Sequence, residues 1–288
     1  MTVPEFVYSV LLRPRPLRFA ANTVLRAIVP EKVVRHGATI VLNPDDPVIS
    51  GALTLGVYES AETSFFLSAC QPGMTFLDIG ANCGYYTALF LSRSGPESRV
   101  IAIEPDPQCF AFLERTVAAN QGRNVTCLRM AASDGCGTAR LYRNLDNRGD
   151  NRLYANDLAT SFCEVETDTV DSMLERLGVR SVNLVKLDVQ GFEGKVLRGM
   201  RKTLAEAPRL ILMSEFWPHG LAQGGTDPSW VVEFLEGMGF HLFLLGGRGK
   251  LREMEQSGRV IRSYRGRRYT NIVATKGVDF RRWLDNHA

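Results

Sequence analysis

From Thr75 onward, hydrophobic positions form short runs that end in polar residues, and stretches with helical spacing separate them. The runs read TFLDIGA, RVIAIEP, VTCLRMAAS, NLVKLDV and RLILMSEFW. Near-continuous apolar runs of this length are typical of strands buried on both faces of a parallel sheet. Between them, YYTALFLSR, PQCFAFLERTVAAN and EGKVLRGMRKTLAEA place apolar residues three or four apart, which predicts helices. Right-handed crossovers would join these strands into a doubly wound α/β sheet.

Three segments lie outside this alternation. Near the end, WVVEFLEGMGF predicts a helix, and HLFLLGG and YTNIVATK predict two strands. After the third strand, TARLYRNLDN and SFCEVETDTVDSMLERLG predict a hairpin and a helix inserted at about residues 138–178. We expect substrate contacts there, because binding residues gather on loops. We interpret the Arg-rich stretch 248–268 as an exposed connection between the last two strands, with a phosphate-binding arm as the alternative.

Residues 1–57 precede this pattern and are interpreted as an N-terminal helical and extended preface to a domain at 58–288. LRFAANTVLRAIV has helical spacing, and ATIVLNP predicts a strand. Residues 1–35 hold six basic and two acidic residues. A helix docked on the core with a solvated basic face is the favoured interpretation; peripheral contact with a membrane surface or an acidic substrate is the alternative.

Composition narrows the class of protein but names no partner. The chain has 288 residues and no apolar stretch near the roughly 20 residues needed to span a bilayer, so we expect a soluble protein. A net charge of +3 is too small to indicate nucleic acid by itself, and we expect no such partner. Six scattered cysteines without metal-ligand spacing, and an N-terminus without signal-peptide order, predict the cytoplasm.

The turn in TFLDIGANCGYYT is the first candidate binding feature. Gly80 and Gly84 permit a tight turn with bare backbone, and Asn82 tolerates left-handed geometry. In open α/β sheets, ligands bind at the carboxyl edge, where strands give way to helices. The turn therefore predicts a ligand in close contact with the backbone.

Charge and spacing around the turn favour S-adenosylmethionine over a dinucleotide. The spacing GxNxG departs from the GxGxxG of dinucleotide sites, and Asp78 would repel a pyrophosphate but attract an ammonium group. Glu104 lies 24 residues after Gly80 and can accept hydrogen bonds from two ribose hydroxyls, as in sites for either cofactor. At the end of the third strand, Ala132, Ser133 or Asp134 could flank the adenine, and an ordinary strand-end turn is an equally good interpretation.

Several motifs together resemble the FkbM-type S-adenosylmethionine-dependent methyltransferases: FLDIGANCGYYT, IAIEPDP, LVKLDVQGFEGKVLRGM and TNIVATK. The resemblance covers residues 58–276. It implies a Rossmann-like class I methyltransferase sheet, mostly parallel with an antiparallel strand near the C-terminus. It also implies S-adenosylmethionine as cofactor and, as acceptor, a hydroxyl of a glycan, glycolipid or secondary metabolite.

Within this resemblance, the most specific element is KxDxxGxE. Its members here are Lys186, Asp188, Gly191 and Glu193. Gln190 departs from the family, which often has Glu at this position. The pair Tyr58-Glu59 resembles the family's YE pair, which implies a lid or a cofactor contact for these residues.

Methyl transfer to a hydroxyl needs a base or a metal, because a hydroxyl is a poor nucleophile. Asp188 and Glu215 follow adjacent predicted strands, and His219 lies four residues after Glu215. Our hypothesis is that Asp188 or His219 is the base and that Glu193 and Glu215 orient it or the acceptor. We expect no metal; the variant in which Asp188 and Glu215 bind Mg²⁺ rests partly on analogy with other O-methyltransferases.

Two other classes of function compete with a methyltransferase. A noncatalytic methyltransferase-like binding module is disfavoured by the retained acidic residues, and a nicotinamide dehydrogenase by the missing GxGxxG. The module would bind neither S-adenosylhomocysteine nor NAD, and the dehydrogenase would prefer NAD. A small molecule and a glycan- or lipid-linked acceptor both fit these motifs, as do O- and N-methylation and any oligomeric state.

Overall fold

The computed structural model describes residues 29–144, 147–155, 159–255, 257–264, 266 and 268–278. The predicted N-terminal helix and most of the basic preface lie outside these residues. The predicted strand ATIVLNP is confirmed as β2 (Ala38–Val41), which forms a hairpin with β1 (Lys32–Arg35). Two helices follow, α3 (Pro47–Leu55) and α4 (Ser60–Ala69). No helix of the described chain is long and apolar enough to cross a membrane.

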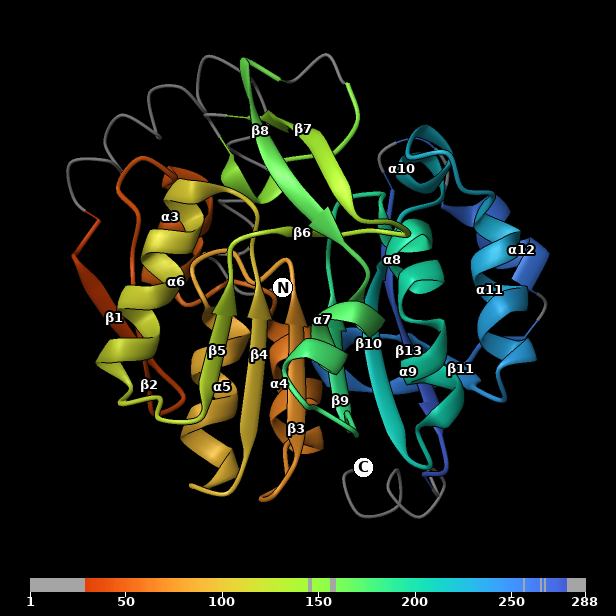
Figure 1. Ribbon diagram of the computed structural model, residues 1–288, viewed down its shortest axis with the longest axis horizontal. Coiled ribbons are helices and arrows are strands. Elements are labelled where there is room, and N and C mark those ends of the chain that lie inside the picture. Colours follow the sequence, from red (N-terminus) through yellow and green to blue (C-terminus); the bar gives the residue numbers. More distant parts are fainter. Residues whose placement is uncertain are drawn as a thin grey trace.

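The largest sheet of the described residues has eight strands in the order β12-β11-β13-β10-β9-β3-β4-β5. Its parallel strands are β3 (Thr75–Ile79), β4 (Arg99–Ile103), β5 (Val125–Leu128), β9 (Leu184–Leu187) and β10 (Leu210–Phe216). The last strand, β13 (Thr270–Lys276), pairs antiparallel with β10 and with β11 (His241–Leu245). The structure thus confirms a doubly wound, Rossmann-like sheet that is mostly parallel with an antiparallel strand near the C-terminus (Figure 1).

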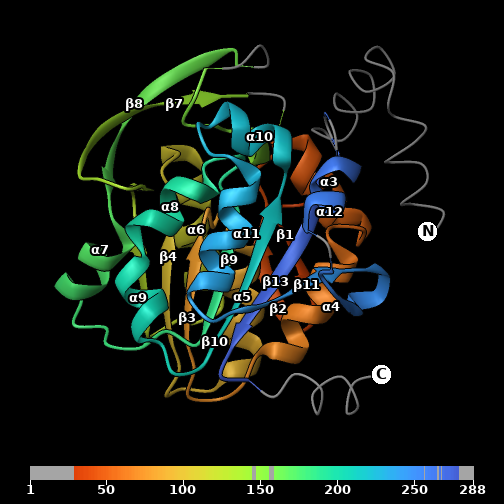
Figure 2. The same cartoon turned by 90° about the vertical axis from the view of Figure 1, so that its right-hand side faces the viewer.

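Helices cover both faces of this sheet (Figure 2). Successive residues of a strand point to opposite faces, so Phe76 and Leu77 of β3 lie in two different hydrophobic clusters. The first cluster includes α5 (Tyr85–Ser94), α6 (Pro107–Ala119), α4 and β2. The second includes α7 (Val170–Arg176), α8 (Glu193–Gly199), α9 (Arg201–Glu206) and α11 (Pro228–Gly237). The described end of the preface therefore shares its core with the sheet.

The helix starts follow local sequence signals at the carboxyl edge. Asp106 caps α6 by accepting hydrogen bonds from the backbone N–H groups of Gln108 and Cys109, and Pro107 occupies the first helical position. Asp227 and Pro228 begin α11 in the same way. These caps fix where each strand-to-helix turn lies, and therefore where the site residues lie.

The inserted segment forms a second sheet above the carboxyl edge (Figure 1). The predicted hairpin is confirmed as β7 (Gly137–Arg143) paired with β8 (Ser161–Asp168), and the predicted helix is α7. The expectation of one continuous strand in VTCLRMAAS is wrong. β5 ends at Leu128, and β6 (Ala131–Ala132) pairs with β8 instead. The reason is that β5 is an edge strand, so the chain beyond it is free to pair with another sheet.

The Arg-rich connection between β11 and β13 is partly structured. It contains the edge strand β12 (Leu251–Glu253) and the helix α12 (Ser257–Ser263). Met254 and Val260 are buried in the core, whereas Arg252, Arg259 and Arg262 are exposed. In the described part of this stretch, the basic side chains thus face solvent, as expected of an exposed connection.

Candidate functional site

The glycine turn after β3 is held by backbone packing on both sides. Gly80 has φ of 82°, and a Cβ added there would lie 1.9 Å from the carbonyl oxygen of Asp188. The N–H groups of Gly80 and Ala81 both donate to the carbonyl of Ile103 in β4. At Gly84, with the same φ, a Cβ would lie 2.8 Å from the Leu113 side chain of α6. The turn needs glycine because neighbouring elements approach it closely.

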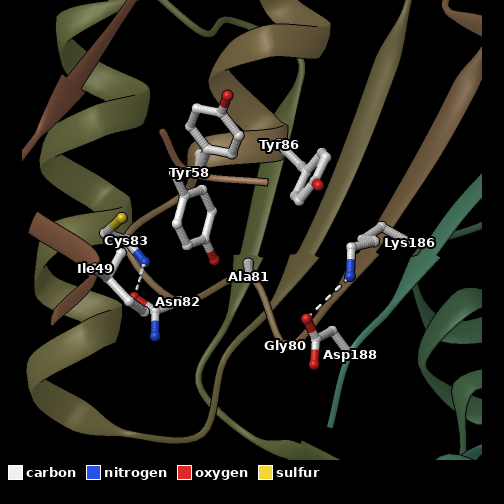
Figure 3. Close-up of a pocket in the computed structure, with 10 residues that line it drawn as sticks. Ile49, Tyr58, Gly80, Ala81, Asn82, Cys83, Tyr86, Lys186 and Asp188 are labelled. Atoms are coloured by element: carbon white, nitrogen blue, oxygen red, sulfur yellow. Dashed lines mark hydrogen bonds and ion pairs between the residues drawn. The ribbon is translucent and has the colours of Figure 1, made fainter. Parts of the chain in front are cut away.

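A pocket opens on this turn (Figure 3). It has an empty volume of about 310 Å³, which includes space open to solvent. Its walls come from α3, the turn, the start of α5 and the end of β9. The lining residues are Ile49, Tyr58, Gly80, Ala81, Asn82, Cys83, Tyr85, Tyr86, Lys186 and Asp188. Gly80, Asn82 and Asp188 of the predicted site therefore line one pocket.

Tyrosines form one wall of the pocket. The ring of Tyr85 meets those of Tyr58 and Tyr86 edge to face, with centroids 5.2 Å apart in both pairs. The Tyr86 hydroxyl donates to Glu59, which has a left-handed backbone with φ of 42° at the start of α4. Burial raises the pKa of Glu59 to about 7, although the Lys186 ammonium opposes this shift. Sequence reasoning named Tyr58 and Glu59 but not Tyr85 or Tyr86.

Glu104 lies directly beside the turn with both carboxylate oxygens held by backbone. Its Oε2 accepts from the N–H of Asn82 at 2.9 Å, and its Oε1 accepts from the N–H of Asp106 at 2.8 Å. The residue is only 6% exposed, and burial raises the pKa of its carboxyl to about 8. Glu104 is therefore fixed in position against the turn without any other side chain.

The other predicted cofactor residues do not line the pocket. Asp78 is buried, and its Oδ2 accepts from the Thr87 hydroxyl at 2.7 Å; burial raises its pKa to about 6. Ala132 is buried in β6, and the backbone oxygen of Ser133 faces Gly199 so closely that a Cβ there would lie 1.9 Å away. Asp78, Ala132 and Ser133 therefore pack against other parts of the protein and do not face the pocket.

Lys186 and Asp188 project from the end of β9 toward the pocket. The Lys186 ammonium lies 3.0 Å from Asp188 Oδ2 and 5.3 Å from the centre of the Tyr86 ring. Burial disfavours the charged amine, yet the carboxylates of Asp188 and Glu59 together raise its pKa. Asp188 Oδ1 accepts from the amide of Gln190 at 2.9 Å. The Gln190 amide thus holds Asp188 in its orientation.

Three acidic residues meet beside this ion pair, and we call them the carboxylate cluster: Asp188, Glu193 and Glu215. Each offers an oxygen, and these atoms lie within 4.8 Å of one another. Burial and the charge of Asp188 raise the pKa of Glu193 to about 7. Burial and the same carboxylate raise that of Glu215 well above its usual range. His219 lies outside the cluster, exposed on α10 (Pro218–Gln223), with its ring 5.8 Å from that of Trp217.

The insertion reaches the same site. The Tyr154 hydroxyl donates to the backbone oxygen of Gln190 at 3.0 Å. The Arg152 guanidinium lies 4.6 Å from the Trp217 ring and 5.7 Å from the Tyr154 ring. Sequence reasoning assigned no role to Tyr154 or Lys186. For Lys186 a signal was present, since a lysine within the fully buried run LVKLDV calls for an acidic partner.

Comparison with known proteins gives one family and several relatives. The model of the FkbM methyltransferase domain matches residues 78–242. Methyltransferase sdnD of Sordaria araneosa is 27% identical over 175 residues, which are 50% of this chain and 67% of sdnD. The 2-O-methyltransferase NoeI of Sinorhizobium fredii is 28% identical over 185 residues, covering 57% of this chain and 72% of NoeI.

Among solved structures, the FkbM methyltransferase of Methylobacillus flagellatus aligns with a TM-score of 0.46 and 12% identity. The alignment covers 90% of this chain and 59% of that one.

Proposed function

The chain belongs to the FkbM methyltransferase family, and from this premise we propose that it transfers a methyl group from S-adenosylmethionine to a hydroxyl of its acceptor. The main support for the proposal is that the pocket on the glycine turn and the carboxylate cluster lie next to each other. A pocket on the glycine turn has Asp188 in its wall, and Asp188 also belongs to the carboxylate cluster. A methyl donor in the pocket and an acceptor at the cluster would therefore be neighbours.

The residues around the turn suit this cofactor in charge and shape. We expect Glu104, which accepts from the N–H of Asn82, to accept hydrogen bonds from the ribose hydroxyls as well. We expect the tyrosine wall to offer ring faces to the cationic sulfonium. Glu59 and Asp188 add negative charge that would attract the ammonium group of the cofactor. A pyrophosphate would meet repulsion from the same carboxylates. The pocket thus favours a cationic donor over a dinucleotide.

The chain's own part in the reaction is to align the two reactants and to remove a proton. Alignment of the acceptor oxygen with the methyl carbon supplies much of the acceleration in a displacement of this kind. The acceptor hydroxyl must also lose its proton, because the alcohol is a weak nucleophile. Asp188 lines the pocket and is our candidate base, with Glu193 and Glu215 beside it to orient the acceptor.

For the acceptor, we propose a hydroxyl of a glycan, a glycolipid or a secondary metabolite. The relative NoeI is named as a 2-O-methyltransferase, which favours oxygen over nitrogen as the acceptor atom. The inserted sheet lies above the carboxyl edge, where an acceptor would enter, and Tyr154 joins it to the loop after β9. We therefore propose that the insertion contributes to the choice of acceptor.

Calorimetric titration with S-adenosylhomocysteine and with NAD tests the cofactor. We expect the protein to bind the first and not the second. At about pH 9, where the Glu104 carboxyl is mostly ionised, Glu104→Gln should weaken binding about tenfold or more, because a hydrogen bond to a charged acceptor contributes roughly 1.5–3 kcal/mol. Glu114→Gln, an exposed change on α6, is the matched control and should bind normally. Binding of NAD alone would favour a dehydrogenase, and binding of neither would favour a noncatalytic module.

A further inference from the structure

The carboxylate cluster is built from three separate elements. Asp188 follows β9, Glu193 is the first residue of α8, and Glu215 lies in β10. Their oxygens lie within 4.8 Å of one another. Hard cations bind carboxylate oxygens at about 2.0–2.6 Å, so two ligands on opposite sides of one ion are about 4–5 Å apart. The spacing of the three oxygens is therefore compatible with a shared ion.

Two oxygens of the cluster are buried without a hydrogen-bond partner. These are Oε2 of Glu193 and Oε2 of Glu215, in residues that are 1% and 8% exposed. Buried polar atoms without partners are rare, because each has lost its hydration without replacement. A bound ion would supply the missing partner for both atoms.

The loop before α8 fixes the orientation of Glu193. Its Oε1 accepts from the backbone N–H groups of Val189 and Gly191, at 3.1 and 3.2 Å. The loop is itself close-packed, since a Cβ on Gly191 would lie 2.6 Å from the backbone oxygen of Gly220 and 2.7 Å from the Tyr154 hydroxyl. One oxygen of Glu193 is thus held by backbone, and the other is left for a ligand.

Charge also favours a cation at the cluster. In the described part of the chain, Lys186 is the one basic side chain in an ion pair with a cluster member, and it contacts Asp188. Among the described residues, neither Glu193 nor Glu215 forms an ion pair with a basic side chain, although both are buried and the Lys186 charge acts on Glu215 from a longer distance. Buried carboxylates are expected to be paired or to coordinate metal.

We propose that Asp188, Glu193 and Glu215 bind a divalent hard cation, of the class of Mg²⁺, Mn²⁺ or Ca²⁺, which holds the acceptor hydroxyl. This role in turnover rests on the proposed function. The cation lowers the pKa of the bound hydroxyl, which loses its proton to solvent or to a carboxylate. The oxygen then forms a bond to the methyl carbon as the carbon–sulfur bond breaks, and the neutral thioether leaves with the electron pair.

This inference reverses our expectation from the sequence, which included no metal. The sequence suggested only Asp188 and Glu215 as ligands, from the order of the predicted strands. Three carboxylates hold a hard cation more firmly than two, because fewer of its six or more oxygen ligands must then be water. The third carboxylate, Glu193, and the partnerless oxygens become apparent only once the loop is folded.

Titration with Mn²⁺, followed by electron paramagnetic resonance, tests the site directly in the full chain. We expect one Mn²⁺ per chain, with Mg²⁺ or Ca²⁺ competing. Glu215→Gln and Glu193→Gln should each weaken Mn²⁺ binding at least tenfold. Glu166→Gln, an exposed change on β8, is the matched control and should leave Mn²⁺ binding unchanged. Circular dichroism and titration with S-adenosylhomocysteine check that each variant is folded.

The outcomes separate this proposal from the proposed function. Wild-type protein that binds S-adenosylhomocysteine but no Mn²⁺ at millimolar concentration overturns the metal site alone. Mn²⁺ binding that survives in both cluster variants also overturns it, since the ion then lies elsewhere. Protein that binds Mn²⁺ through the cluster but no S-adenosylhomocysteine keeps the metal site and contradicts the proposed cofactor. Methyl transfer that stops with a chelator and returns with Mg²⁺ or Mn²⁺ would support both.

Discussion

Two glutamates at the carboxyl edge of one sheet differ in the hydrogen bonding of their carboxylate oxygens. Glu104, beside the glycine turn, has both oxygens hydrogen bonded to backbone N–H groups. Glu215, on the other side of β9, has a buried Oε2 without a partner. We call the turn with its pocket the cofactor half of the proposed site, and the carboxylate cluster the acceptor half. Backbone groups hold Glu104 in the cofactor half, whereas the acceptor half contains buried oxygens without a partner, which a ligand could bind.

The two halves touch at Gly80, so the largest effect is expected there. Gly80→Ala places a Cβ 1.9 Å from the backbone oxygen of Asp188 and forces a left-handed φ on alanine. We expect a loss of stability on the order of 3 kcal/mol and loss of S-adenosylhomocysteine binding. Chemical denaturation and calorimetry measure the two effects.

Gly73→Ala is the matched control for this prediction. Gly73 has a similar φ of 78°, but no atom lies within 4 Å of an added Cβ. Alanine there should cost only about 1 kcal/mol, from backbone strain alone. Equal losses in the two variants would show that backbone strain, and not contact between the halves, requires glycine at position 80.

The second largest effect is expected for Asp188→Asn, which should reduce methyl transfer much more than cofactor binding. Asp188→Asn removes a cluster charge and replaces one carboxylate oxygen with an amide nitrogen, while the shape of the side chain beside Lys186 is kept. We expect methyl transfer to fall about 100-fold or more, whether Asp188 acts as a base or as a ligand. S-adenosylhomocysteine affinity should fall by about tenfold at most, because Asp188 also lines the cofactor pocket. Glu114→Gln, the exposed change on α6, is again the control and should keep its turnover. Near-normal turnover in Asp188→Asn would exclude this residue from catalysis.

The glycine turn and the position of Glu104 beside it were predictable from the sequence because their signals are local. Apolar runs mark the buried strands, and Gly80 and Asn82 mark a turn with left-handed backbone. Glu104 follows the next strand, so parallel pairing brings it to the same edge. Here chain order and spatial order agree, because β3 and β4 are neighbours in both.

The positions of the other site residues depend on contacts between distant segments, which the spacing of residues in the sequence does not reveal. Asp78 belongs to the same motif as Gly80, yet its side chain bonds Thr87 inside the fold. Glu193 joins the cluster only because a close-packed loop turns it back toward Asp188. Tyr154 arrives from an insertion 36 residues before its partner Gln190. Such positions follow from packing between distant segments, which periodicity and motif spacing leave undetermined.

The smallest predicted effect is a pH dependence confined to the cofactor half. Burial raises the pKa of Glu104 to about 8, so its carboxyl is mostly protonated in the free protein at pH 7. Ribose hydroxyls donate to the ionised form, so S-adenosylhomocysteine affinity should rise about tenfold between pH 7 and pH 9 and then level off. Calorimetry across this range measures the rise, and it should vanish in Glu104→Gln but persist in Glu215→Gln.

The raised pKa of Glu104 also makes folding stability depend on pH, but stability falls as the pH rises whereas ligand affinity increases. The folded state holds the Glu104 proton more tightly than the unfolded chain, whose carboxyl has its usual pKa of 4.5. This contribution to stability is full below pH 4.5 and is lost as the pH rises through about 8. Denaturation of Glu104→Gln should therefore show a flatter pH profile than that of the wild type. If ligand affinity and stability were both independent of pH in the wild type, Glu104 would be ionised throughout. The backbone N–H groups of Asn82 and Asp106 would then outweigh its burial.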